Sequence, residues 1–213
     1  MDNAKKIAAD MLAAINIDNS GFLSAVAKGF ISFPVSLGYL GYDFIDTDRR
    51  RENLDDKYRL ACLVKTATFN KDLIEKVIKP FIDDFVSRID MDKIVLFTKN
   101  VTGTFAGKVI FAQVTGVNIG RAIVSQGIAS YVSGFGVGGV LAIGAEASRS
   151  IYTARYLRER NPKMYDRLYR MGDLDLLYYL VEDVVRPYEK ACAIAESNSE
   201  EFNRIFNYFI GGL

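Results

Sequence analysis

The residues closest to a catalytic or metal-binding set are acids in one short stretch. Asp46 and Asp48 begin like a calcium-binding loop, but arginines follow where further ligands and a glycine are required. The neighbouring acids that could complete a metal site or an acid–base pair, as in nucleases, are Asp43, Asp55 and Asp56. Because Arg49–Arg51 lie among them, we interpret 43–57 as an exposed connection with solvated ion pairs around a helix start.

Histidine is absent from all 213 residues. This excludes Ser-His and Cys-His nucleophile pairs and removes the commonest zinc ligand. Cys62 and Cys192 lie far apart among apolar neighbours, which favours two reduced core thiols in a cytosolic protein and leaves a long-range disulfide open. The sequence therefore predicts no catalytic residue, no metal and no cofactor, and a protein that is not an enzyme.

Two glycine patterns are similar to phosphate-binding loops. Gly134, Gly136 and Gly139 match G-x-G-x-x-G, with Glu159 twenty residues further on, but the flanking strands that a dinucleotide fold requires are missing. The segment 103–109 has three residues between its glycines instead of four, and valine follows its lysine, so it is not a P-loop. A dinucleotide-binding enzyme is therefore the least favoured of three functional interpretations of the glycine-rich sequence.

The most unusual feature is a glycine-rich apolar segment. Between Arg121 and Glu146 lie 24 consecutive uncharged residues. As a helix this run would be about 36 Å long, and a bilayer core needs about 30 Å. Its regularly spaced glycines would let another helix approach closely, as in membrane helix pairs: they are Gly120, Gly127, Gly134 and Gly138.

Basic residues follow this segment, and we expect them to face lipid headgroups or a partner: Arg149, Arg155, Arg158 and Arg160. Permanent residence in a membrane is disfavoured, because 133–139 is poor helix material and ordinary integral proteins have longer spans. Basic and acidic side chains nearly cancel, at 27 against 26, which argues against a nucleic-acid partner.

Two interpretations of the segment remain. In the first, a non-enzymatic, water-soluble protein inserts the segment into a bilayer, with oligomerisation on insertion left open. This plan resembles pore-forming bacteriocin domains, which have about two hundred residues and amphipathic helices around an apolar hairpin, although the hairpin here is mid-chain. In the second, the segment is a tightly packed core, and the chain is a soluble protein-binding module, such as an immunity, adaptor or regulatory protein.

The elements that must position these residues are helices. We expect an all-α, single-domain bundle over 1–213, with about six to nine helices around a central glycine-rich apolar hairpin or helix. Amphipathic helices fill 1–100, the glycine-rich segment spans 101–145, and Arg- and Tyr-rich helices fill 146–213. The start has no cleavable signal peptide, so we expect a cytoplasmic protein as synthesised, with membrane association only after a trigger.

Local patterns predict several boundaries. Amphipathic helices are expected over 4–15, 54–68 and 71–89, the last with a kink or restart at Pro80. Asn161-Pro162 opens a helix that Gly172 ends, and Asp173 begins the next one. Ser197 and Glu200 form a capping box for the last helix, and the best strand candidate is Lys93–Thr98.

Overall fold

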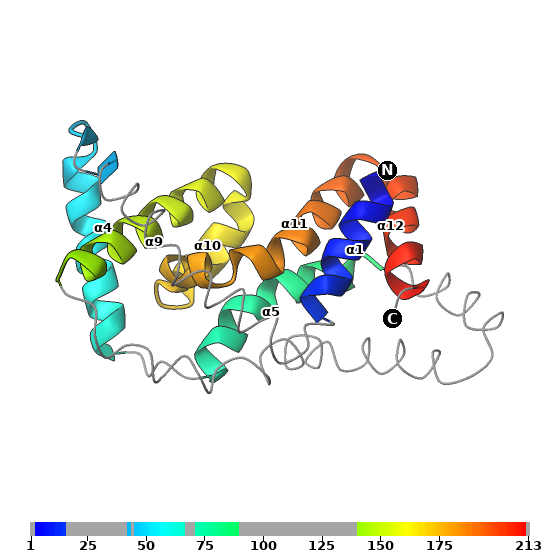
Figure 1. The fold of residues 1–213 in the computed structure, drawn as a ribbon, viewed down its shortest axis with the longest axis horizontal. Helices are drawn as coiled ribbons and strands as arrows, with labels where there is room; N and C mark the ends of the chain where they lie inside the picture. The colour runs from blue at the N-terminus through cyan, green and yellow to red at the C-terminus, as the bar shows by residue number, and fades with distance from the viewer. Residues whose placement is uncertain (1–2, 16–41, 44, 67–70, 90–139, 212–213) are drawn as a thin grey trace.

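The computed structural model describes residues 3–15, 42–43, 45–66, 71–89 and 140–211 (Figure 1). In these ranges the chain forms eight helices and no strand. They are α1 (Asn3–Ile15), α4 (Arg50–Thr66), α5 (Lys71–Ser87), α9 (Val140–Arg160), α10 (Pro162–Arg170), the 3-10 helix η1 (Leu174–Leu180), α11 (Glu182–Ser197) and α12 (Ser199–Gly211). The all-α prediction is confirmed for this part, while 101–139 and the strand candidate 93–98 lie outside it.

An aromatic core joins α1, α5, α11 and α12 at one end of the molecule (Figure 1). Phe85 of α5 lies at its centre, and its ring packs edge-on against Tyr188, Phe202 and Phe209 at centroid distances of 5.5–5.9 Å. The buried Tyr188 hydroxyl donates a hydrogen bond of 3.1 Å to the carbonyl of Met11 in α1. Large aromatic side chains pack favourably in a core when their rings meet edge to face and a buried hydroxyl has a hydrogen-bond partner.

The amphipathic helix α5 confirms its predicted face. The apolar spacing of 71–89 predicts two adjacent rows, which are buried except for the partly buried Val86 and Ile89 at the end: Leu73, Ile74, Val77, Ile78, Phe81, Ile82 and Phe85. The helix continues through Pro80, so the predicted restart is absent. The proline removes one backbone donor, and the burial of both rows on each side of it holds the helix together.

The predicted start of α10 is correct, but the helix predicted to follow it is not. Asn161 caps α10 by accepting a hydrogen bond of 3.1 Å from the Met164 amide, with Pro162 in the first turn. Gly172 (φ 94°) and Asp173 (φ 62°) then reverse the chain in the left-handed region. The predicted single helix from Asp173 is wrong, since 174–180 form a 3-10 helix before α11 begins.

The reason is burial on every side of η1. Its first five residues, 174–178, are all buried, which a one-sided amphipathic α-helix on the surface cannot achieve. The predicted capping box of α12 is also wrong. Ser197 is still the last residue of α11, so Asn198 caps α12 by accepting a hydrogen bond of 3.0 Å from the Glu201 amide.

Candidate functional site: the charged interface between α4 and α9

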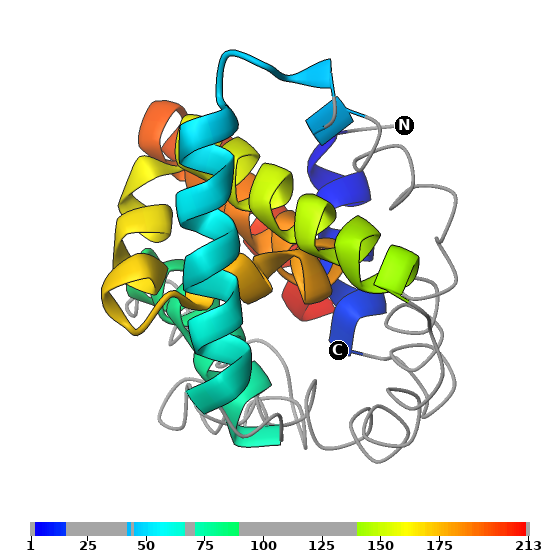
Figure 2. The ribbon, with the colours of Figure 1, turned by 90° about the vertical axis from the view of Figure 1, so that its left-hand side faces the viewer.

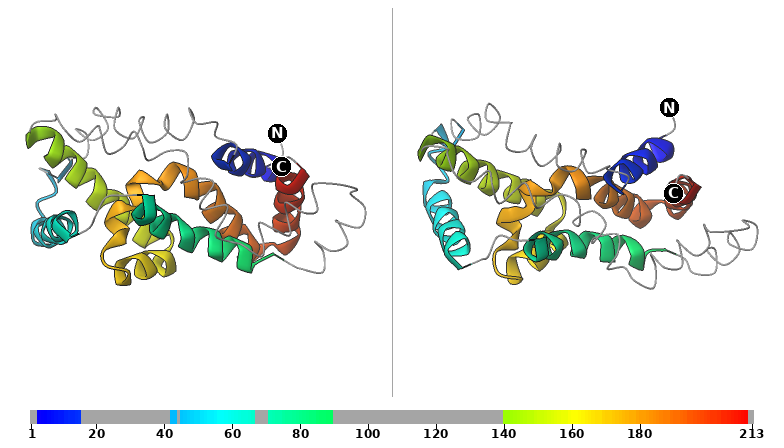
Figure 3. Two further views of the ribbon diagram at one scale, coloured as in Figure 1. Left: turned by 90° about the horizontal axis from the view of Figure 1, so that it is seen from below. Right: turned by 60° about the horizontal axis from the view of Figure 1, so that its bottom comes forward.

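Helix α4 lies at one end of the molecule, opposite α1 and α12, and α9 crosses behind it (Figures 2 and 3). The predicted boundary was wrong, because α4 begins at Arg50 inside the polar run expected to be a connection. Among its described side chains only Asn53 and Leu63 are buried, with Leu60 packed partly against the core. Helix α4 is therefore attached mainly by polar contacts.

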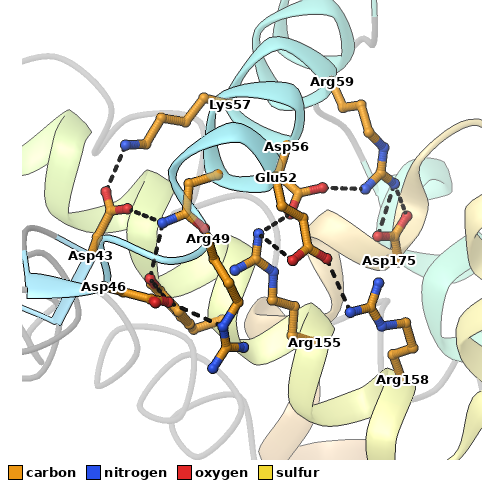
Figure 4. A network of polar contacts seen from close by, with 12 residues as sticks. Asp43, Asp46, Arg49, Glu52, Asp56, Lys57, Arg59, Arg155, Arg158 and Asp175 are labelled. Atoms are coloured by element: carbon orange, nitrogen blue, oxygen red, sulfur yellow. Dashed lines mark hydrogen bonds and ion pairs between the residues drawn. The ribbon is translucent and has the colours of Figure 1, made fainter.

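The inward side of α4 carries charged residues at helical spacing. Glu52, Asp56 and Arg59 recur at intervals of three and four residues, so they share one side of the helix. Asp56 accepts a hydrogen bond of 2.7 Å from Nη2 of Arg155, and Glu52 accepts one of 3.0 Å from Nη2 of Arg158 (Figure 4). Both arginines come from α9, so these two ion pairs join α4 to α9.

Arg59 ties α4 to η1. Its Nη2 donates to both carboxylate oxygens of Asp175, at 2.7 and 2.9 Å, its Nε donates to Asp173 at 2.8 Å and its Nη1 to Asp56 at 2.9 Å. The guanidinium carbon also lies 4.4 Å from the centre of the Tyr169 ring. Burial alone would lower the pKa of Arg59, but the charge of Asp175 and these hydrogen bonds raise it above its ordinary value.

Asp175 is the most deeply buried carboxylate of this interface, with no exposed surface. Burial raises its pKa to about 6, although the charge and hydrogen bonds of Arg59 act in the opposite direction. Asp173, whose charge also raises that pKa, lies on the other side of Arg59. The ion pair thus has short hydrogen bonds, but the burial of its charges costs desolvation free energy.

Asp43 holds the first half of α4 to α9. It accepts hydrogen bonds from the Asn53 amide at 2.7 Å and from the Ser148 hydroxyl at 3.1 Å, and it forms an ion pair of 2.6 Å with Lys57. Asn53 and Lys57 belong to α4, and Ser148 belongs to α9. One carboxylate on the preceding turn therefore binds both helices.

Tyr152 of α9 completes this end of the interface. Its hydroxyl donates to Asp46 at 3.0 Å and accepts from Asn53 at 3.1 Å, and the Tyr42 ring packs edge-on against it at 4.9 Å. Burial, followed by the influence of Asp46, raises the pKa of the Tyr152 phenol to about 12 although the hydrogen bond from Asn53 lowers it. The neutral phenol can therefore serve as a hydrogen-bond donor at physiological pH.

The interface is not fully satisfied. Arg155 is 4% exposed, yet its Nε and Nη1 have no hydrogen-bond partner within the described part of the chain, and neither has Oδ1 of Asn53. The Tyr152 ring, 5.3 Å from the Arg155 guanidinium carbon, gives partial compensation. Each such buried donor or acceptor costs about 1–3 kcal/mol. The ion pairs therefore hold α4 less firmly than their number suggests.

The structure divides the predicted basic cluster among three neighbours. Arg155 and Arg158 bind α4, whereas Arg160 binds α11 through Glu189 at 3.1 Å. The guanidinium carbon of Arg149 lies 5.5 Å from the ring centre of Tyr179, and Glu146 is half-buried on α9. Contact of Arg155 with lipid or a partner would therefore require α4 to leave it.

The other predicted site residues lie outside the described ranges: Gly120, Arg121, Gly127, Gly134 and Gly138. Sequence reasoning missed the partners on α4, Glu52 and Asp56, and the buried Asp175. The i, i+4 spacing of Glu52 and Asp56 was visible, but their arginines are 106 and 99 residues away along the chain, respectively.

A second group of charges surrounds a cleft of about 280 Å³ between α5, α11 and the start of α10. Several of its charged residues are paired with one another, as in the bond of 2.7 Å from Arg88 to Glu196 and that of 3.2 Å from Lys163 to Asp84. The thiol of Cys192 lines the same cleft, and burial raises its pKa. Both cysteines are free thiols in the structure.

Comparisons with protein-family models, curated proteins and solved structures find no match for this chain. In the described ranges, no helix combines the length and the apolar character needed to cross a bilayer. In the same ranges, no three His, Cys, Asp or Glu side chains form a group that could hold a metal ion.

Proposed function

We propose that this chain is a non-enzymatic, membrane-active protein that starts as a water-soluble helical bundle and inserts its glycine-rich segment into a bilayer. One observation carries the proposal. Helix α9 runs without interruption from Val140, inside the glycine-rich segment, to Arg160, and its middle part forms the charged interface with α4. One continuous helix thus connects the apolar segment to the interface with α4, which ion pairs hold together.

The segment itself has the properties that insertion requires. Its 24 uncharged residues are long enough to cross a bilayer core of about 30 Å as a helix. Arg121 and Glu146 would mark its two ends. Close contact with another helix would use the spaced glycines, Gly120, Gly127, Gly134 and Gly138.

The charged interface is suited to opening. Of the described apolar side chains of α4, Leu63 is the buried one that release of the helix would expose, so these side chains oppose the movement only weakly. The apolar side of α9, with Ile151, Ala154 and Leu157, is buried and packs on η1, so α9 can stay attached to the body. Opening would free Arg155 and Arg158 for lipid phosphates.

A protein-binding module is the second candidate function. The observation that favours it is the exposure of Leu54 and Tyr58 on α4, because exposed large apolar residues at one helix face are typical of partner-binding surfaces. In that case the glycine-rich segment is core and the protein has no affinity for lipid.

The test is dye release from vesicles that contain anionic lipid, at neutral and at acid pH. We expect release by the wild-type protein and its loss in Gly134→Leu, whose side chain would block close helix contact. The matched control is Gly211→Leu, since a side chain added at Gly211 meets nothing within 4 Å. Intact vesicles with the wild-type protein would overturn the proposal in favour of the binding module. Unchanged release by Gly134→Leu would overturn the role of that glycine.

A further inference from the structure

The outward side of α4 combines exposed apolar and basic residues. Leu54 and Tyr58 are 67% and 72% exposed and lie one turn apart. On an α-helix, Arg50, Arg51 and Lys57 all point within about 60° of the direction of Leu54. The outward side of α4 is therefore an apolar strip with basic residues on both flanks, and the name outer face is used for Arg50, Arg51, Leu54 and Tyr58.

Two of the three acids of α4 lie away from this outer face, whereas the exposed Asp55 lies one turn from Arg51. Glu52 and Asp56 point to the opposite side of the helix, where Arg158, Arg155 and Arg59 neutralise them. Lys57 is paired with Asp43. Arg50 and Arg51 are exposed and form no ion pair with any other described residue, so together with Asp55 they leave a net positive charge at the outer face.

The turn that precedes α4 carries two further exposed apolar residues. Ile45 is 74% exposed and Tyr42 is 47% exposed, and both lie within eight residues of the helix start. Because α4 occupies one end of the molecule and stands nearest the viewer in Figure 2, its outer face can meet a broad flat surface.

We propose that the outer face of α4 docks the protein on an anionic lipid bilayer. Leu54 and Tyr58 would enter the boundary between headgroups and acyl chains, and Arg50 and Arg51 would bind lipid phosphates or carboxylates above it. This division is that of an interfacial helix, in which basic side chains extend from an apolar face toward the headgroups. Docking rests on the proposed membrane function, but it is a separate step that precedes insertion.

Flotation with vesicles tests docking independently of insertion. The probes are vesicles of phosphatidylcholine alone and vesicles of phosphatidylcholine mixed with phosphatidylserine, at neutral pH. We expect the wild-type protein to float only with the anionic vesicles and to be released by high salt. Each double variant, Leu54→Ala/Tyr58→Ala or Arg50→Gln/Arg51→Gln, should weaken binding roughly tenfold or more.

Matched controls exclude an indirect effect. Tyr208→Ala and Arg170→Gln change exposed residues of the same type on α12 and α10 and should leave binding unchanged. Alanine and glutamine are good helix formers, so circular dichroism and the midpoint of thermal unfolding should stay as in the wild type.

The outcomes separate the two proposals. Binding by Gly134→Leu without dye release would support docking and place insertion downstream of it. Binding by the wild type without release would leave docking supported while the proposed insertion fails. Undiminished binding by the α4 variants, equal binding to neutral vesicles, or a wild type that binds only a protein partner would each overturn docking at this face.

Discussion

The guanidinium of Arg59 and the fully buried carboxylate of Asp175 are 116 residues apart in the chain and meet through two hydrogen bonds of 2.7 and 2.9 Å. Asp175 lies on η1, and Arg59 lies on a helix with little apolar contact to the body. This pair therefore links α4 directly to the buried 3-10 helix.

Arg59→Met should destabilise the protein by about 3 kcal/mol, because it leaves the charge of Asp175 buried without its partner. Urea unfolding followed by circular dichroism measures the change. Arg51→Met on the exposed side of the same helix is the control, and its effect should stay within about 0.5 kcal/mol. Equal losses in the two variants would mean that the ion pair contributes nothing to stability.

The raised pKa of Asp175 makes its contribution to folding more favourable in acid, although protonation also removes the charge that attracts Arg59. Its pKa is about 6 in the folded protein against an ordinary value of 3.8, so between these values the folded state retains a proton that the unfolded state has released. The resulting stabilisation is fully present below pH 3.8 and is lost as the pH rises through 6. It amounts to on the order of 3 kcal/mol, at about 1.4 kcal/mol per pKa unit.

Asp175→Asn isolates this contribution. The free energy of unfolding of the wild type minus that of the variant should decrease as the pH is raised from 4 to 6. Urea titrations of both proteins at a series of pH values measure it. A difference that is constant across this window would show that Asp175 does not titrate there. The predicted sign concerns the free energy of unfolding of the whole protein; protonation of Asp175 at the same time removes its charge attraction to Arg59.

Asp56→Asn should speed dye release from anionic vesicles several-fold. Asp56 is the hydrogen-bonded partner of Arg155, so its loss leaves that buried guanidinium without a charged hydrogen-bond acceptor and weakens the hold of α4 on α9. The neighbouring Asp55 is exposed, which makes Asp55→Asn a control of identical charge change. If the release rates change equally in both variants, the effect comes from the change in net charge and not from the interface.

Tyr188→Phe should lower the free energy of unfolding by about 1 kcal/mol, because it removes the buried hydrogen bond to the Met11 carbonyl. Thermal unfolding measures the change, with the half-exposed Tyr208→Phe as a control that should have almost no effect. A wild-type stability for Tyr188→Phe would indicate that α1 is held by apolar contacts alone.

The two thiols should differ in reactivity. Cys192 is buried and burial raises its pKa, whereas Cys62 is half-buried on α4. With a thiol reagent such as DTNB, one thiol should react in the native protein and the second only after denaturation. Cys62→Ser should remove the fast phase, and its persistence in that variant would contradict the arrangement.

Features with a local cause were predictable from the sequence. The buried rows of α5 follow from apolar spacing within 17 residues, and the start of α10 follows from Asn161 and the proline after it. The 3-10 form of η1 was not predictable, because it depends on helices that cover it from several sides. No local pattern distinguishes five consecutive buried residues from the start of an amphipathic helix.

The charged interface shows the same limit. The acids before and within α4 were assigned to the adjacent arginines, and only the pair of Asp46 with Arg49, at 3.3 Å, follows that assignment. Asp56 and Glu52 instead bind arginines of α9. A side chain with several possible partners of opposite charge selects among them by tertiary geometry, which spacing in one chain does not specify.

The contact of α1 with α11 and α12 has a consequence for synthesis on the ribosome. The carbonyl of Met11 meets its hydrogen-bond donor 177 residues later, and Phe85 meets two of its ring partners only in α12. Contacts of such separation form slowly and only after the later segment has emerged. Until α11 and α12 have left the ribosome, α1 and α5 therefore lack these partners, and the aromatic core closes only at the end of synthesis.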